Sequence, residues 1–372
     1  MIVLRADGKE VIPAHDAGIK RLVLSAAHGL LVSLSYDRTL CLWDVSGDLP
    51  TRVDKANLPD DVWPRSCAFT AGTTLIFGTF GATYQTYDYE CRSWGSSSVP
   101  PTYGVNAACA YQGGVLAVGD AGIVWRDDVA HASTGSLCNF LTPATDAVIT
   151  GGQLGNVFDA LTGTVLHQHR SPLNCGSRFW RNGIEHVLVG TYTGEGILLR
   201  IDSRGVVEHV RDLRLHANAV KGVAVSGDLI FSVSADTSAT WQSATTLETI
   251  KVLPDAHDRI ANGCVGLGSG RFASVSRDLK LRLWEPNFTK TVVNTPHTHS
   301  IKCVAAGTEG RLVATGSYDG HVAVYDRYTN TWPTIVRPTA AGISSLSYDA
   351  ERRRFLASSY DGTIYPVTGE LT

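Results

Sequence analysis

The chain has 372 residues, of which 44% are hydrophobic and 18% are charged, and its formal net charge at pH 7 is −3. This length exceeds what one ordinary compact core can serve, so the core must grow by repetition. The even charge balance excludes a global basic field, which argues against general binding to nucleic acid or to an anionic membrane.

The N-terminal residues MIVLRADGK contain no apolar stretch long enough for the core of a signal peptide. No apolar run in the chain approaches the roughly 18 residues that a membrane-spanning helix needs. We therefore expect a cytoplasmic, intracellular protein with no membrane partner. Eight cysteines without a C-x-x-C spacing predict neither a disulfide framework nor a zinc knuckle.

A polar turn recurs along the chain, first as LSYDR at residues 34–38, then as GSYDG at residues 316–320 and SSYDG at residues 358–362. In the C-terminal half its aspartates follow one another at intervals of about 41 residues. Around each turn lie short runs such as VKGVAV, RLVATGS and HVAVYD, rich in Val, Ile, Leu and Ala and broken by Gly and Asp. They have no helical period, so the sequence predicts an all-β fold.

These residues resemble the WD-repeat β-propeller family. Four repeats carry His, Ser, Asp and Trp or Tyr at the family's spacing: His15, Ser35, Asp37 and Trp43; His216, Ser234, Asp236 and Trp241; His257, Ser276, Asp278 and Trp284; His299, Ser317, Asp319 and Tyr325. A fifth keeps Ser359 and Asp361, with Tyr365 as its aromatic residue. The resemblance is weak between residues 60 and 210, where strand pattern and glycine turns indicate four degenerate repeats.

Five clear and four degenerate repeats favour a closed propeller of nine four-stranded blades, each of about 41 residues. Seven or eight blades are the alternatives if a degenerate segment is an insertion. The residues after Asp361 suffice for a third strand but hardly for a fourth. KEVIPAH at residues 9–15 matches KVLPDAH at residues 251–257, which precedes another repeat. We therefore expect residues 1–14 to supply the closing strand of the last blade, and residues 1–372 to form one domain.

The recurring Ser, His and Asp suggest a nucleophilic triad as one interpretation, which requires one unique set in a cleft with donors for an oxyanion. Here the set is repeated and includes a Trp that has no role in such chemistry. No G-x-S-x-G, P-loop or H-E-x-x-H pattern occurs. The resemblance implies that these residues form a structural hydrogen-bonded network, which satisfies the polar groups of a buried turn. We expect no catalytic residue, no enzyme activity and no cofactor.

Two patterns in the sequence suggest metal sites. Six cysteines fall in the first strands of their repeats, but equivalent positions on successive blades are expected about 10 Å apart, too far for sulfurs that must lie about 2.3 Å from one zinc ion. HTH at residues 297–299 and HQH at residues 167–169 each offer two histidines, although alternation along a strand makes such pairs common. We expect packed thiols and no metal site.

The residue before the turn aspartate carries the functional prediction. It is Tyr36, Tyr318, Tyr360 or Arg277 on four blades that a closed ring would make neighbours, with Lys20 and Lys302 at the same rim. Tyr and Arg dominate binding hot spots; the alternative is that they merely cover the turn. We expect a non-catalytic scaffold or adaptor for a protein or peptide, monomeric on its own or a subunit of a larger complex. The alternative function is an enzyme or small-ligand binder that uses the central channel.

Overall fold

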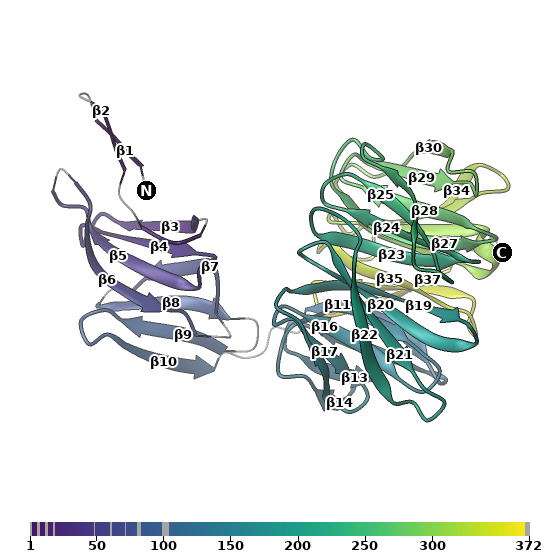
Figure 1. Cartoon of the computed structure of the whole chain (residues 1–372), viewed down its shortest axis with the longest axis horizontal. Coiled ribbons are helices and arrows are strands. Elements are labelled where there is room, and N and C mark those ends of the chain that lie inside the picture. Colours follow the sequence, from purple (N-terminus) through teal and green to yellow (C-terminus); the bar gives the residue numbers. More distant parts are fainter. Residues whose placement is uncertain are drawn as a thin grey trace. The chain divides into compact units, whose positions relative to one another are not determined.

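The computed structural model describes residues 2–5, 8–11, 14–17, 19–47, 49–59, 62–70, 72–79, 83–98 and 104–368. It consists of two compact units, Met1–Pro101 and Thr102–Thr372, which are described separately. In the described residues, strands form eight four-stranded sheets, one three-stranded sheet and one two-stranded hairpin (Figure 1). A single short 3₁₀ helix, η1 (Thr308–Gly310), occurs in this part of the chain. The all-β prediction is therefore confirmed.

The first unit contains the hairpin and two four-stranded antiparallel sheets. The hairpin pairs β1 (Ile2–Arg5) with β2 (Gly8–Val11). The sheets comprise β3 (Ile19–Ser25), β4 (Leu30–Ser35), β5 (Thr39–Asp44) and β6 (Thr51–Asn57), and β7 (Val62–Phe69), β8 (Thr74–Thr79), β9 (Thr83–Asp88) and β10 (Ser93–Ser98). Apolar side chains from both sheets, among them Leu34, Leu42 and Phe77, form one buried cluster between them.

The second unit contains seven antiparallel sheets whose strands lie in chain order. They comprise β11 (Val105–Tyr111), β12 (Gly114–Gly119), β13 (Ile123–Arg126) and β14 (Val129–Ser133); β15 (Cys138–Pro143), β16 (Val148–Gly152), β17 (Asn156–Asp159) and β18 (Val165–Gln168); β19 (Leu173–Arg181), β20 (Ile184–Thr191), β21 (Glu195–Ile201) and β22 (Val207–Arg214); β23 (Val220–Ser226), β24 (Leu229–Ser234), β25 (Ala239–Ser243) and β26 (Thr249–Leu253); β27 (Ala261–Gly268), β28 (Arg271–Ser276), β29 (Lys280–Trp284) and β30 (Lys290–Asn294); β31 (Ile301–Ala306), β32 (Leu312–Ser317), β33 (Val322–Asp326) and β34 (Thr331–Val336); β35 (Ile343–Asp349), β36 (Arg354–Ser359) and β37 (Ile364–Val367).

The first strands of neighbouring sheets contact one another in the second unit, whereas a fourth strand such as β26 is mostly exposed. Second and third strands are buried on both faces because each sheet is packed between two others: Phe231 of β24 contacts Phe272 of β28, with ring centroids 4.9 Å apart. The strand β35 contacts both β31 and β11. The seven sheets of this unit therefore follow one another around a circle.

A single ring of nine sheets closed by the N-terminal strand, as we had expected, is not confirmed. Residues 1–14 were expected to close the ring, but within them β2 pairs with β1. The sheet β35–β37 has three strands in the described residues. Its neighbour is the sheet β11–β14, because Ile364 of β37 packs on an apolar cluster formed by Val105, Ala108 and Ala117. Counting repeats does not reveal such contacts. The number of blades and the single domain of residues 1–372 stay predictions.

No helix among the described residues is both long enough and apolar enough to span a bilayer.

Candidate functional site

A β-bulge occupies the same position near the start of every first strand in the second unit. In β23, Val220 pairs with Ser234 and Gly222 pairs with Val233, which leaves Lys221 unpaired between them. A bulge re-aims the side chain of its extra residue. Equivalent register shifts single out Asn106, Asn139, Asn174, Lys221, Asn262, Lys302 and Ser344. All of these except Asn106 line a central cavity of about 190 Å³ that is bounded by all seven first strands.

Five of these bulge side chains donate a hydrogen bond to a backbone carbonyl of the next sheet's first strand. Four amides do so: Asn106 to Cys138 at 3.0 Å, Asn139 to Leu173 at 2.8 Å, Asn174 to Val220 at 2.9 Å and Asn262 to Ile301 at 2.6 Å. The fifth donor, the hydroxyl of Ser344, bonds Val105 and so links the last sheet to the first. We call these five donors the channel girdle. They join neighbouring sheets and satisfy carbonyls at the channel mouth.

Two bulge positions carry lysine. The Nζ atom of Lys221 lies 4.4 Å from the centroid of the Tyr192 ring, within the range of a cation–π contact. Lys302 lines the central cavity with Lys221. One acid lies nearby: Asp120 accepts a hydrogen bond from Asn106 at 2.9 Å, and burial raises the pKa of its carboxyl. The channel mouth thus combines neutral amides with two cations.

Three tyrosines of the second unit lie at the turn position that precedes the network aspartate or its equivalent. The rings of Tyr318 and Tyr360 are nearly parallel, at 10°, with centroids 6.4 Å apart, and the two residues are 41% and 42% exposed. Burial, followed by the neighbouring Tyr318, raises the pKa of the Tyr360 phenol. Tyr192 has the equivalent position in the sheet β19–β22, because Thr191 pairs with Leu173 as Ser317 pairs with Ile301.

The structure brings together part of the predicted arc. Tyr318 and Tyr360 are neighbours, and Arg277 is exposed at the same turn position of the sheet β27–β30. Tyr36 and Lys20 lie in the first unit, where the lysine Nζ is 5.9 Å from the tyrosine ring centroid. The arc that joins these two residues to the others stays a prediction.

Sequence reasoning missed Tyr192 and Lys221. Their signals are present: TYTG at residues 191–194 aligns with SYDG at residues 317–320, and VKG at residues 220–222 aligns with IKC at residues 301–303. Tyr192 was overlooked because the aspartate used for alignment is replaced by Thr193 in its segment. Lys221 was overlooked because Ala235, and not Tyr or Arg, precedes the aspartate of its repeat.

The histidine networks contain a serine other than the predicted one. His257 Nε2 lies 2.8 Å from Ser274 Oγ, to which Trp284 Nε1 donates at 2.8 Å. The same chain joins His15, Ser33 and Trp43. The predicted turn serines donate instead to loop carbonyls: Ser35 to Ala17, Ser234 to Asn218, Ser276 to Arg259 and Ser317 to His299. Alternation along the strand explains the correction, since the bridging serine is two residues earlier on the same face.

The network of the sheet β31–β34 uses a different histidine. His297 is buried, and its Nε2 lies 2.8 Å from Thr315 Oγ1, whereas the side chain of His299 is 67% exposed and lies 3.3 Å from Asp319. His297 therefore replaces the predicted His299. The hydroxyl of Tyr325 donates to Asn330 and lies outside the network.

The remaining networks also vary. The Nδ1 and Nε2 atoms of His216 bond Ser238 and Ser232, and Ser238 donates to Asp236 at 2.5 Å, while the buried Trp241 Nε1 has no hydrogen-bond partner among the described residues. Asp278 lies 2.7 Å from the buried Arg282. In the last sheet, Asp361 accepts from Thr339 at 2.5 Å and from Tyr365 at 2.9 Å. His216 and the aspartates of these sets are held by local bonds, whereas Trp241 Nε1 is not, and these local bonds support a structural role.

The pKa values of the network groups fit that role. Burial lowers the pKa of His216, His257 and His297 to about 4, so each imidazole is neutral at pH 7. Burial alone would raise the pKa of Asp37, but hydrogen bonds from Thr39 and from the backbone of Asp16 lower it to about 2. In the networks of His216, His257 and His297, a neutral imidazole thus acts as a fixed donor and acceptor.

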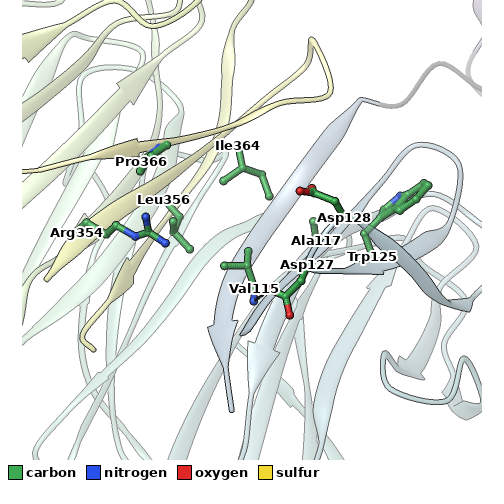
Figure 2. A pocket seen from close by; sticks show the side chains of 9 residues that line it. All are labelled: Val115, Ala117, Trp125, Asp127, Asp128, Arg354, Leu356, Ile364 and Pro366. Carbon is green, nitrogen blue, oxygen red and sulfur yellow. Dashed lines mark hydrogen bonds between the residues drawn. The ribbon is translucent and has the colours of Figure 1, made fainter. Parts of the chain in front are cut away.

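A groove lies between the sheets β11–β14 and β35–β37. Figure 2 shows Trp125, Val115 and Ala117 on one wall and Ile364, Leu356 and Pro366 on the other. Asp127, Asp128 and Arg354 add charge to it. A second hollow of about 460 Å³ shares Ala117, Trp125, Asp128 and Ile364 with it. The three-stranded sheet therefore has a half-apolar depression at its side.

The comparisons with known proteins agree with this geometry. A family model described as WD domain, G-beta repeat, matches residues 9–44 and 289–326, the regions of two of the repeats recognised above. The chain thus carries repeats of the WD40 β-propeller family. Proteins of the WD40 family are typically non-catalytic and act as interaction adaptors.

Two curated proteins that match part of this chain are both named DDB1- and CUL4-associated factor 10. Identity to the protein of Homo sapiens is 36% over 84 residues, which covers 22% of this chain and 15% of the relative. Identity to the protein of Mus musculus is 34% over 79 residues, which covers 21% of this chain and 14% of the relative. The matched stretch thus spans about a seventh of either relative.

Two solved structures resemble the fold. The crystal structure of the WD40 β-propeller domain of Doa1 has a TM-score of 0.61 at 16% identity and covers 72% of this chain and 94% of that chain. The computationally designed Ika8 protein has a TM-score of 0.51 at 17% identity, with coverage of 96% and 98%. At such identities the likeness concerns the fold alone.

Proposed function

We propose that this WD40-repeat chain is a non-catalytic adaptor that binds an extended segment of a partner protein, rich in acidic and aromatic residues, at the channel mouth of its second unit. The observation that carries the proposal is the pair Lys221 and Lys302. They occupy bulge positions where the other sheets have girdle donors, and Lys221 lies against Tyr192. The two lysines add positive charge at these positions, and neither is one of the five donors of the channel girdle.

The chemistry of the mouth suits such a segment. Lysine ammonium groups attract carboxylates through charge-assisted hydrogen bonds, and half-exposed tyrosines give contact area at low entropic cost. Tyr318 and Tyr360 already face one another in a stacked pair, so little side-chain order remains to be gained on binding. Because exposed charges are screened by salt, the affinity should fall as ionic strength rises.

The similarity to DDB1- and CUL4-associated factor 10 supports a more specific proposal. The chain would act as an adaptor, or substrate receptor, associated with DDB1 and CUL4. Because the similarity covers 22% of this chain, this association is tested separately from peptide binding. Purified DDB1 should form a complex with the full chain in size-exclusion chromatography. Separate elution at micromolar concentrations would contradict this part of the proposal and leave the peptide site standing. The intracellular location expected from the sequence stays a prediction.

The size of the central cavity favours the adaptor over the small-ligand alternative. Ligand pockets commonly enclose about 300–1,000 Å³, and this cavity has about 190 Å³. It is also bounded by girdle amides whose hydrogen bonds are already made to backbone carbonyls. The lysines and tyrosines at the channel mouth are better suited to the acidic and aromatic side chains of a partner protein than to a small molecule inside the cavity.

Fluorescence anisotropy with labelled peptides tests peptide binding directly. A 12-residue peptide of Glu, Asp, Tyr and Phe should bind the full chain, and a matched peptide of Gln, Asn, Tyr and Phe should bind more weakly. Lys302→Ala, Tyr318→Ala and Tyr360→Ala should each weaken binding by about 1–3 kcal/mol if they are hot spots. Melting temperatures should change little, because these side chains are not part of the girdle.

Matched controls come from surfaces away from the mouth. Lys251→Ala changes an exposed lysine on the outer strand β26, and Tyr328→Ala changes a 71% exposed tyrosine on the turn between β33 and β34. Arg353→Ala changes the hairpin tip between β35 and β36. Binding that survives the mouth variants but is lost in these controls would move the binding surface to the opposite face.

A further inference from the structure

Two neighbouring sheets of the second unit place histidines together at their outer strands. β18 contributes His167, and β22 contributes His209 and Asp212. The two strands contact one another although they belong to different sheets. The cluster lies away from the channel mouth, so the proposed adaptor function makes no use of it.

A bulge explains why two of these residues share a face. In a regular strand, residues three positions apart point to opposite sides. In β22, Arg211 pairs with Leu198 and His209 pairs with Leu199, which leaves Val210 as the extra residue. This shift returns Asp212 to the side of His209, and His209 Nε2 lies 3.0 Å from Asp212 Oδ1.

The three side chains converge on one small volume. The rings of His167 and His209 are stacked, with centroids 4.1 Å apart and an interplanar angle of 15°. One ligand atom from each of His167, His209 and Asp212 lies within 4.8 Å of the other two. Two donors on one tetrahedral zinc ion are about 3.3 Å apart, since each bond is about 2.0–2.2 Å long. Side-chain rotations that bring the ligand atoms about 1.5 Å closer together would therefore let all three bind one ion.

A neutral imidazole has a lone pair that can bind a metal. Without a metal, stacking two imidazoles gains little from their charges. A cation between them and Asp212 would neutralise the carboxylate and use both lone pairs.

A fourth residue is placed to orient the carboxylate. His169 is buried, and its Nδ1 accepts a hydrogen bond from the backbone N–H of Ser171 at 3.1 Å, so Nε2 carries the proton. That nitrogen lies 3.9 Å from Asp212 Oδ2 and 3.5 Å from Glu195 Oε2. Outer groups of this kind hold ligating carboxylates in position and tune metal affinity.

We propose that His167, His209 and Asp212 form a Zn²⁺ site that joins the outer strands of the sheets β15–β18 and β19–β22, with His169 as a positioning residue. Two imidazoles and one carboxylate are a donor set that zinc accepts, with water in the fourth position. The site ties together two strands that otherwise meet only through side chains. The sequence pattern HQH pairs His167 with His169, whereas the second histidine ligand, His209, comes from the neighbouring sheet.

Metal titration of the full chain, without a polyhistidine tag and after treatment with chelator, tests the proposal. One equivalent of Zn²⁺ should bind in competition with a chromophoric chelator and should raise the melting temperature. His167→Gln combined with His209→Gln should lower the affinity by about 100-fold or more, and His169→Gln by about 10-fold. His131→Gln, on the exposed outer strand β14, is the matched control and should leave the affinity unchanged.

Substitution of Co²⁺ for Zn²⁺ gives an independent readout in the unmutated protein. Visible d–d bands without a thiolate charge-transfer band are expected for nitrogen and oxygen ligands. A thiolate band, less than one equivalent of bound zinc, or zinc binding that persists in the double variant would overturn the proposal. Far-ultraviolet circular dichroism of the metal-free variants confirms that they are folded when affinity is compared.

Discussion

Asp278 and Arg282 form a buried ion pair, with the carboxylate oxygen 2.7 Å from Arg282 Nη2. Only 2% of the arginine is exposed, and its other carboxylate partner, Asp258, lies 3.1 Å away on the surface. Burial alone would raise the pKa of Asp278, but the hydrogen bond and charge of Arg282 lower it. The turn aspartate of this sheet thus neutralises a buried cation in addition to capping its turn.

Asp278→Ala should therefore destabilise the protein more than the equivalent change in another sheet. Removing one partner of a buried pair costs about 3–5 kcal/mol, and Asp278→Ala leaves Arg282 only the exposed carboxylate of Asp258. Asp236→Ala breaks hydrogen bonds to neutral groups and should cost about 1–3 kcal/mol. Urea unfolding of both variants measures the difference. Replacing the cation as well, in Asp278→Ala with Arg282→Met, should recover much of the loss; equal stability of the two single variants would refute the role of the pair.

The choice between His297 and His299 gives a second prediction. His297→Ala removes a buried ring bonded to Thr315 and should lower the free energy of unfolding by about 1–3 kcal/mol. His299→Ala changes a largely exposed side chain and should lower it by less than about 0.5 kcal/mol. Chemical denaturation of both variants checks the order. A larger effect at His299 would restore the assignment made from the sequence.

Stability should fall as the pH drops from about 6.5 to about 4. Burial lowers the pKa of His216, His257 and His297 to about 4, whereas an unfolded histidine titrates near 6.5. Unfolding therefore takes up protons in this window, and each histidine removes about 3 kcal/mol of stability across it. Urea midpoints between pH 7 and pH 4.5 measure the slope, and His297→Gln should flatten it. A constant midpoint over this range would show that these histidines are accessible.

The girdle bond between Ser344 and Val105 gives a prediction about ring closure in the second unit. Ser344→Ala leaves a buried carbonyl without its donor and should cost about 1–3 kcal/mol. Hydrogen exchange should accelerate in β35 and β11, which this bond joins. Asn139→Ala, which breaks the equivalent bond to Leu173, is the control and should instead affect β15 and β19. Identical exchange maps for the two variants would argue against local bonds between sheets.

Short-range patterns in the sequence determined much of the fold. Runs of Val, Ile, Leu and Ala without a helical period, separated by Gly and Asp, predicted an all-β fold that the structure confirms. The S-x-D turns also placed Tyr318 and Tyr360 at equivalent positions of consecutive repeats, and their rings stack. These features depend on residues close together in the chain, so turn chemistry and alternation suffice to predict them.

The tertiary structure alone decided which distant groups meet. Ser344 and Val105 are 239 positions apart, and no local pattern links them. His297 and His299 are two residues apart and lie at nearly the same spacing from Asp319, and packing buries only His297. Lys221 acquires its role from Tyr192 of the preceding sheet, and His167 acquires its partner from β22. Apolar burial is non-directional, so the sequence marks which side chains are buried, whereas the packing of whole sheets selects their neighbours.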